Sequence, residues 1–279
     1  MNSELRNIPY FGVGLGLRRE LREQIMKRRQ EIDVLEIIPE HYIDKPGETA
    51  VLESFSKSFK LVPHGLKLSI GTSAGLNKTY VDKVKGILEK IGAEYHSDHF
   101  ALTDIGDFSI GHLSPLWFTK EGLEAAVKNI NKAKEILGMP LVFENITSFF
   151  EIPEADFSEP EFIKRALEQT GSGLLLDLTN VLINSYNRKT DPFRFLEQLP
   201  LEKVVHIHLA GGKITNGWFY DTHSEELNGP NERVWPLLEW VTARADIKTV
   251  IIERDQNFKE NFEEMILNDI RHAKKILAK

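Results

Sequence analysis

Two pairs of side chains in the stretch VVHIHLAGGKITNGWFYDTH have the spacing of metal ligands. His206 and His208 lie two residues apart in an apolar, β-branched run, so on an extended strand both imidazoles point to one face. After two glycines and a loop the chain returns with Asp221 and His223, an oxygen and a nitrogen ligand with the same spacing. Buried histidines are often satisfied by hydrogen bonds, so this stretch alone leaves metal binding and a hydrogen-bonded core equally open.

Other predicted strands end in the same kinds of side chain. Six of the nine histidines and five carboxylates fall at a predicted strand end or in the loop after one: His64, His96, His99, His206, His208, His223, Glu144, Asp177, Asp221, Glu253 and Asp255. Buried carboxylates that converge repel one another, and bound cations are the simplest remedy. We therefore expect a polynuclear metal site, with a solvated network of acids and histidines as the alternative. Eight residues could hold two or three ions, with Asn180 as a neutral oxygen ligand: His64, His99, Glu144, Asp177, His208, Asp221, His223 and Glu253.

Composition limits the chemistry further. The chain has 279 residues, 41% hydrophobic and 28% charged, which is typical of a soluble globular protein. It has no cysteine, which excludes disulfides, thiolate ligands and a cysteine nucleophile. The net charge of −7 disfavours nucleic acid as a partner. No apolar run is long enough to span a membrane, and the N-terminus does not resemble a signal peptide, so we expect a cytoplasmic protein.

The elements that must position these side chains alternate between strands and helices. The expected strands are Phe11–Leu17, Asp33–Ile38, Leu61–Leu66, Glu94–Phe100, Pro140–Ile146, Gly173–Leu178, Lys203–Leu209 and Lys248–Arg254. The expected helices are Arg19–Arg29, Glu48–Lys60, Lys78–Ile91, Thr119–Leu137 with Thr119 as N-cap, Glu159–Gln169, Pro192–Gln198, Glu232–Arg244 and Asn261–Leu277. Gly211–Pro230 is expected to be a structureless loop, a kind of segment that is usually functional.

This alternation predicts an α/β protein that is a single (β/α)8 TIM barrel of the xylose-isomerase-like type, with residues 1–279 as one domain. Near-continuous apolar strands are typical of a parallel sheet with both faces buried. The glycines of FGVGLGL lack dinucleotide-binding spacing and are better explained by close packing at a barrel bend. In such a barrel the reactive residues lie at the carboxyl ends of the strands, where the histidines and acids gather here.

Many short motifs along the chain match those of a known family and occur in the same order. They are GVGLGLR, LEIIPEHYI, HGLKLSIG, SDHF, LSPL, FENITSFF, LLLDLTN, HIHLAGG, DTH and VIIERD. Nearly the whole chain resembles the DUF692 family, also called UPF0276 or the multinuclear non-haem iron-dependent oxidative enzymes. The resemblance implies an enzyme, a metal-dependent oxidoreductase with two or three irons. It would use dioxygen to modify a peptide, characteristically at cysteines of a ribosomally made precursor, which a small partner protein often presents.

The resemblance also implies roles for individual residues. On the matching positions His64, His99, Glu144, Asp177, Asn180, His208, Asp221, His223 and Glu253 would hold the metal. Asp255, from the ERD motif, would lie beside the substrate and act on it. Asn145 at a strand end and Trp218 in the long loop are expected to contact substrate. Iron is expected in the active form, with other divalent metals able to replace it in purified protein.

Three positions depart from the family pattern. Asp98 stands where the family commonly has glutamate in SEH, Gly212 where HLAGH has a histidine, and His41 where PENY has asparagine. These differences affect the expected shape of the substrate pocket more than the expected set of metal ligands.

Other functions on the same barrel stay open from the sequence. A divalent-metal hydrolase of the apurinic-site endonuclease type has a similar ligand order, but its Asp-x-x-His would align with Asp177-x-x-Asn180. A sugar isomerase would leave several histidines unexplained. A metal-binding or scaffold protein without activity is the remaining alternative.

Overall fold

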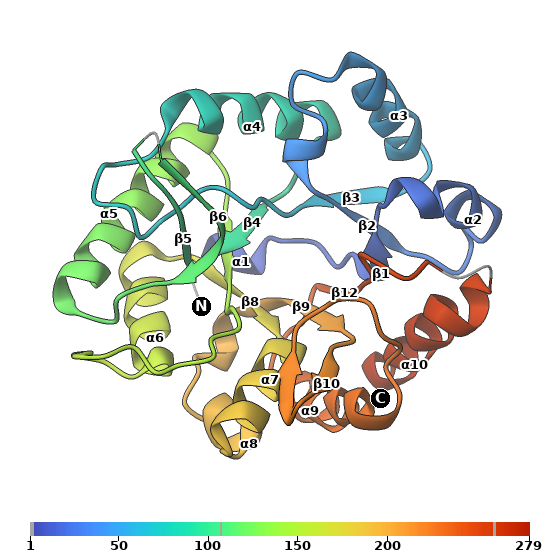
Figure 1. Ribbon diagram of the computed structural model, residues 1–279. Coiled ribbons are helices and arrows are strands. Elements are labelled where there is room, and N and C mark those ends of the chain that lie inside the picture. The colour runs from blue at the N-terminus through green and yellow to red at the C-terminus, as the bar shows by residue number, and fades with distance from the viewer. Residues whose placement is uncertain (1–2, 107, 259–260) are drawn as a thin grey trace.

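Eight parallel strands form a nearly closed barrel with helices around it (Figure 1). The computed structural model describes residues 3–106, 108–258 and 261–279. The strands run in the order β3-β2-β1-β12-β9-β8-β7-β4, and every hydrogen-bonded pair among them is parallel. Their bounds are β1 (Gly12–Gly16), β2 (Val34–Ile37), β3 (Lys60–Pro63), β4 (His96–His99), β7 (Leu141–Glu144), β8 (Gly173–Asp177), β9 (Val204–Ala210) and β12 (Thr249–Glu253). The predicted barrel is confirmed. The predicted domain of 1–279 includes residues 1–2, 107 and 259–260, which lie outside the described residues.

The barrel closes at the carboxyl ends of two strands. The first and last strands of the sheet, β3 and β4, meet in an isolated parallel bridge between His64 and Ser97. There the backbone N–H of Gly65 donates to the carbonyl oxygen of Ser97 at 2.7 Å, and that of His64 donates to Ile37 at 2.8 Å. The seam of the barrel therefore coincides with a predicted ligand position.

Helices connect the successive strands of the barrel, while α1 precedes the first strand and α10 follows the last. They are α1 (Ser3–Arg6), α2 (Arg22–Lys27), α3 (Pro46–Ser56), α4 (Lys78–Ile91), α5 (Lys120–Leu137), α6 (Glu159–Thr170), α7 (Leu178–Arg188), α8 (Pro192–Leu196), α9 (Val234–Thr242) and α10 (Asn268–Leu277). Short 3-10 helices are η1 (Arg19–Leu21), η2 (Pro39–His41), η3 (Leu201–Lys203) and η4 (Gly229–Arg233), and η5 (Glu263–Leu267) is a π-helix that leads into α10. The predicted N-cap Thr119 is confirmed, because its hydroxyl accepts from the N–H of Gly122 at 3.1 Å.

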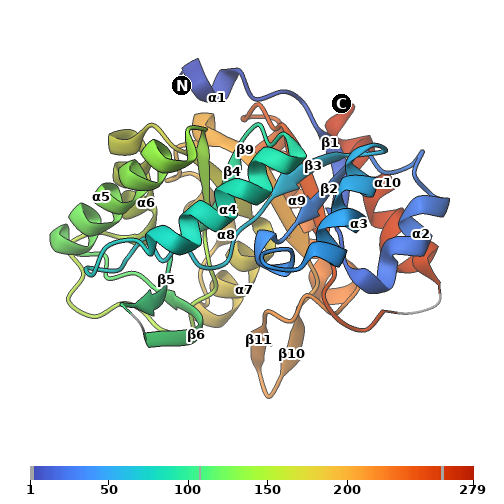
Figure 2. The ribbon, with the colours of Figure 1, turned by 90° about the horizontal axis from the view of Figure 1, so that it is seen from above.

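Two apolar layers support the barrel. The larger cluster packs between the strands and the surrounding helices. The smaller fills the barrel interior at its amino end, where Leu5, Ile8 and Phe11 pack against inward-facing strand residues such as Val62 and Leu175. Figure 2 shows α1 at the end of the molecule opposite the two hairpins. Every helix in the described part of the chain is too short or too polar to cross a lipid bilayer.

The sequence places Asp177 and Asn180 together at the end of the sixth predicted strand and predicts no helix between them and Pro192. Both expectations were wrong for Asn180, which lies in the first turn of α7, directly after Asp177. The Asp177 carboxylate is the N-cap, and its Oδ1 accepts from the N–H of Asn180 at 2.7 Å. A strand that ends on the N-cap of the next helix leaves no loop, so the boundary was missed.

Two antiparallel hairpins project from the carboxyl end of the barrel (Figure 2). The prediction that Gly211–Pro230 is structureless was wrong, because β10 (Lys213–Thr215) and β11 (Trp218–Tyr220) pair in register. Asn216 and Gly217 join them with φ of 52° and 80°, and an Asn-Gly pair between extended residues is a strong hairpin signal. The second hairpin is β5 (Ala101–Ile105) with β6 (Phe108–Pro115).

Close packing explains the glycine-rich first strand, and we expect it to be intolerant of side chains. A Cβ at Gly14 would lie 1.7 Å from the backbone oxygen of Val34 on the neighbouring strand. Gly14→Ala is expected to destabilise the protein by about 3 kcal/mol or more. The control Gly86→Ala, on α4 with nothing within 4 Å, should stabilise it by about 0.5 to 1 kcal/mol. Urea unfolding measures both, and equal stabilities would contradict the packing explanation.

Candidate metal centre

Three predicted ligands meet at the barrel seam. The Nε2 atoms of His64 and His99 lie 3.2 Å apart. The Oε2 atom of Glu144, at the end of the neighbouring strand β7, lies 3.1 Å from His64 Nε2 and 3.3 Å from His99 Nε2. All three side chains are buried. Two ring nitrogens and a carboxylate oxygen therefore face one another in the protein interior.

The hydrogen bonds behind the two rings decide which nitrogens carry protons. His99 Nδ1 lies 3.1 Å from the carbonyl oxygen of Gly65, which can only accept, so Nδ1 carries the proton. The Ser97 hydroxyl donates to the carbonyl of Pro63 at 3.0 Å, so it accepts from His64 Nδ1 at 3.1 Å. In the neutral rings both Nε2 atoms then present bare lone pairs to each other and to a carboxylate. This arrangement is repulsive unless a cation lies between them.

A second group shares the same glutamate. Ligand atoms of Glu144, Asp177, His208 and Glu253 all lie within 4.8 Å of one another, and all four residues are buried. His208 Nδ1 lies 3.1 Å from Glu253 Oε2 and 3.6 Å from Glu144 Oε2. Glu144 thus belongs to both groups and could serve as a ligand in each.

A third group forms nearer the mouth. His223 Nε2 lies 2.9 Å from Asp221 Oδ1 and 3.8 Å from Glu253 Oε2. The other nitrogen, Nδ1, lies 3.4 Å from Asp255 Oδ2, while Arg18 Nε donates to Asp255 Oδ1 at 2.7 Å. Asp255 therefore contacts the ring on the side away from the ligand group. This geometry fits the prediction that Asp255 is not a principal ligand, and it offers Asp255 a role in orienting His223.

The ligand atoms share one further property. Seven of the nine predicted ligands contribute a buried atom that makes no hydrogen bond within the described residues: Glu144 Oε2, Asp177 Oδ2, Asn180 Oδ1, His208 Nδ1, Asp221 Oδ1, His223 Nε2 and Glu253 Oε2. Buried polar atoms are normally paired, so a cluster of acceptors without a hydrogen bond is typical of residues that bind a cation. Imidazole nitrogen and carboxylate oxygen suit iron, manganese or zinc. The residues fit a multinuclear metal site.

The protonation equilibria of the site show the same excess of negative charge. Burial and the charges of Glu144 and Glu253 raise the pKa of Asp177 well above its usual value. Burial lowers the pKa of His99, but the charges of Glu144 and Asp98 outweigh burial and raise it to about 9. Protons are thus drawn to the positions where metal ions would bind.

A buried carboxylate beneath the ligands, Glu36, was not among the predicted site residues. It lies on β2, is fully buried, and its Oε2 accepts from His208 Nε2 at 2.9 Å. This bond keeps the proton on Nε2 and leaves Nδ1 free for metal, as in other carboxylate–histidine–metal arrangements. The signal was an acid inside the apolar strand DVLEII. Arg18 and Ser97 were likewise assigned no function in the metal site, because their partners are distant in sequence.

Two of the clustered histidines, His96 and His206, lie outside the three groups. His206 and His208 share a face of β9 as predicted, with ring centroids 4.7 Å apart. His206 Nδ1, however, lies 3.1 Å from the Tyr95 hydroxyl. Burial lowers the pKa of His206 well below its usual value and that of His96 to about 4. Both are neutral core histidines.

Two asparagines connect the ligand strands. The side chain of Asn145 donates to the carbonyl of Asp177 at 3.0 Å and accepts from its N–H at 2.9 Å. Asn180 Nδ2 donates to the carbonyl of Asn145 at 2.9 Å, so its Oδ1 is turned away from this bond. These contacts favour a positioning role for Asn145, and its predicted contact with substrate stays a prediction.

Aromatic side chains gather beside the third group. Trp218 and Tyr220 on β11 lie with ring centroids 6.1 and 5.4 Å from that of Phe149. All three are substantially exposed, and Tyr220 directly precedes Asp221. The position of Trp218 is compatible with the predicted substrate contact, which stays a prediction.

The departures from the family pattern lie at the mouth. A Cβ at Gly212 would lie 2.4 Å from the backbone oxygen of Tyr220, so the hairpin occupies the space of a histidine. Asp98 accepts from the N–H groups of His99 and Leu68 at 2.7 and 3.2 Å. His41 ends the short helix η2 and is exposed.

The chain is similar to known proteins in sequence and in fold. The family model described as "RiPP precursor modification enzyme MbnB/TglH/ChrH" matches residues 12–278. A UPF0276 protein of Acinetobacter baylyi is 31% identical over 88% of this chain and 85% of its own. A UPF0276 protein of Nitrosospira multiformis is 31% identical over 95% and 93%.

Similar solved structures share the fold at low identity. D-psicose 3-epimerase of Clostridium cellulolyticum H10 has a TM-score of 0.58 at 11% identity, over 96% of this chain and 97% of its own. A xylose isomerase domain protein of Alicyclobacillus acidocaldarius has a TM-score of 0.58 at 14% identity, over 96% and 99%. These likenesses confirm the xylose-isomerase-like barrel.

We expect His208 and Glu36 to affect the metal in different degrees. His208→Ala removes a ligand atom and should lower the metal-to-protein ratio. Glu36→Gln keeps the size of the side chain and the ligand set, and should weaken metal affinity about 10- to 100-fold because the ring loses its anionic acceptor. Chelator competition and elemental analysis measure both, with exposed His112 replaced by alanine as control. Full occupancy in His208→Ala would remove it from the ligands, and unchanged affinity in Glu36→Gln would deny its orienting role.

Proposed function

Since the chain belongs to the family of RiPP precursor modification enzymes MbnB/TglH/ChrH, we propose that it is an iron-dependent oxidoreductase that uses dioxygen to modify a peptide. The modified residues are cysteines of a ribosomally made precursor. Two or three irons bind in the three ligand groups, and other divalent metals replace iron in purified protein. The enzyme acts in the cytoplasm.

One observation carries the metal part of this proposal. Glu144 Oε2 lies within 3.6 Å of ring nitrogens of His64, His99 and His208. In the neutral rings, hydrogen bonds on the far side place the proton on the nitrogen that faces away from Glu144. A carboxylate oxygen close to three such nitrogens supports metal binding at this position.

Iron, when bound, supplies one-electron redox chemistry and a place for dioxygen to bind. Residues of this chain bind the metal and shape the mouth of the barrel. Asp255, fixed by Arg18, orients His223 and faces the mouth with its side chain 38% exposed. A carboxylate there can accept a proton from a peptide group or align its backbone.

The peptide substrate follows from the family, and the shape of the mouth supports it. Exposed aromatic rings of Phe149, Trp218 and Tyr220 adjoin the ligand Asp221. Such rings suit an extended peptide. A small partner protein that presents the peptide remains part of the proposal.

The hydrolase alternative is weaker in the structure. Where the endonuclease pattern has a histidine, Asn180 offers one amide oxygen, and its nitrogen is used by the backbone of Asn145. The net charge of −7 also opposes DNA binding. The epimerases at 9 to 15% identity share only the fold.

Reconstitution without air tests the reaction. Protein loaded with ferrous iron and then mixed with air is expected to consume dioxygen and to change the mass of a cysteine-containing peptide encoded beside its gene. Zinc-loaded protein should do neither, because zinc has no accessible redox state. An oxygen electrode and peptide mass spectrometry follow both. Iron-loaded protein that consumes no dioxygen and leaves every such peptide unchanged would refute the reaction, and cleavage of abasic DNA by the zinc form would favour the endonuclease.

Asp255→Asn separates substrate chemistry from metal binding. The amide keeps the size but loses the charge, so turnover is expected to fall about 100-fold or more while iron content is retained. Exposed Asp246, replaced by asparagine, is the control. Iron content and turnover are measured on the same samples. Loss of iron together with turnover would instead make Asp255 part of metal binding.

A further inference from the structure

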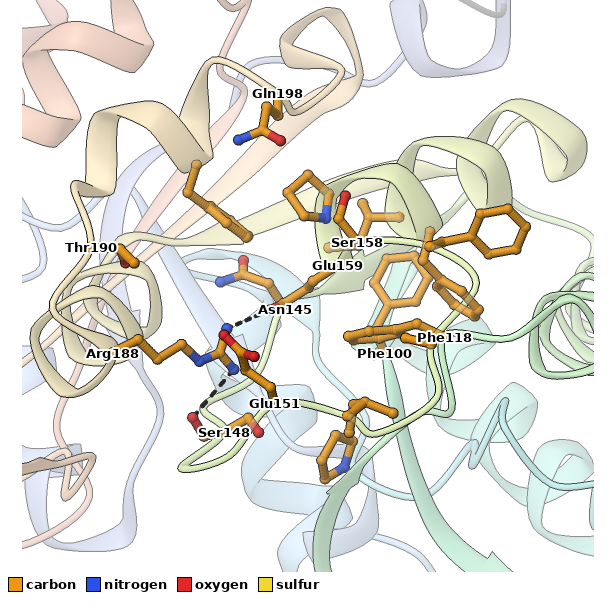
Figure 3. A pocket seen from close by; sticks show the side chains of 18 of the residues that line it. Phe100, Phe118, Asn145, Ser148, Glu151, Ser158, Glu159, Arg188, Thr190 and Gln198 are labelled. Atoms are coloured by element: carbon orange, nitrogen blue, oxygen red, sulfur yellow. Dashed lines mark hydrogen bonds and ion pairs between the residues drawn. The ribbon is translucent and has the colours of Figure 1, made fainter.

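A large cavity lies beside the metal centre. Its volume is about 710 Å³, within the range of small-molecule and side-chain pockets. The loop at 147–158, the start of α6 and the segment from the end of α7 into α8 form its walls (Figure 3).

Most of the wall is apolar and aromatic. Figure 3 shows the rings of Phe100 and Phe118 close together on one side of the cavity. Phe100 and Phe162 are buried. Five phenylalanines line the cavity in all, namely Phe100, Phe118, Phe157, Phe162 and Phe195. Such a wall favours a bulky apolar group over a sugar or a phosphate.

One side of the cavity is polar. Arg188 pairs with Glu159 at 3.2 Å and donates to the carbonyl of Ser148 at 3.3 Å, as the dashed lines in Figure 3 show. These two bonds hold the guanidinium in the wall of the cavity.

The cavity is continuous with the ligand strands. Phe100 directly follows the ligand His99, and Asn145 directly follows the ligand Glu144, and both line the cavity. An occupant would therefore touch the ends of two ligand strands. The rest of a molecule that places one group in the cavity would extend toward the mouth of the barrel.

We propose that this cavity is a specificity pocket for a bulky apolar side chain of the peptide substrate. The pocket would select the peptide and fix its register relative to the metal centre. The identification of the occupant as a peptide rests on the proposed function. The size of the cavity and its aromatic wall are independent of it.

Blocked single amino acids test the pocket without any turnover. The metal-loaded protein is titrated by NMR with N-acetyl-phenylalaninamide and with N-acetyl-alaninamide, which share a backbone and differ only in the side chain. The phenylalanine probe is expected to bind about tenfold or more tightly. Equal affinity of the two probes would overturn the proposal.

Filling the cavity should abolish the difference between the probes. Ile152 and Ala155 line the cavity from the loop, so Ile152→Trp and Ala155→Trp are expected to reduce binding of the phenylalanine probe to that of the alanine probe. Ala74→Trp, at an exposed position of another loop, is the control. Circular dichroism and metal content show whether each variant is folded, and two variants guard against misfolding of one. Undiminished binding in both folded variants would place the probe elsewhere and overturn the proposal.

The outcomes separate this pocket from the proposed reaction. Probe binding by a protein that never consumes dioxygen would keep the pocket and reject the oxidative function. Peptide oxidation by a protein that does not discriminate between the probes would keep the function and reject the pocket.

Discussion

Buried negative charge at the carboxyl end of the barrel is the constraint on which the site depends. Glu144, Asp177 and Glu253 are each at most 6% exposed and converge on shared space. Arg18 is a buried cation nearby, and it is already paired with Asp255. The raised pKa of Asp177 expresses this imbalance. Since uncompensated charge is costly in an interior, bound metal ions would also stabilise this end of the barrel.

The seam of the barrel and the first ligand group are built from the same bonds. The bridge that joins β3 to β4 is formed by His64 and Ser97. Ser97 also fixes the His64 ring, and Gly65, which donates across the seam, fixes the His99 ring. A metal held by both histidines would thus reinforce the single bridge that joins β3 to β4. The geometry of this ligand group and the closure of the barrel are therefore coupled.

Local sequence predicted most of the fold, and its errors have local causes. Eight apolar strands and most helices follow from periodicity and caps such as Thr119. The helix after Asp177 was missed because one residue serves as strand end, helix cap and ligand candidate. The hairpin of β10 and β11 was missed although Asn216-Gly217 is a turn signal. An alternating pattern of apolar and polar residues cannot be recognised over strands of only three residues.

The sequence by itself determined which residue types are available and at which end of a barrel they gather. Without cysteine, histidine and carboxylate were the strong ligands left, and their positions after apolar strands placed them at one mouth. Only the tertiary structure decided that Glu144 is shared among three rings, that Glu36 lies beneath His208, and that Asp255 lies between Arg18 and His223. These partners are up to 237 residues apart along the chain. Local pattern cannot encode such contacts, because the closure of the barrel brings them together.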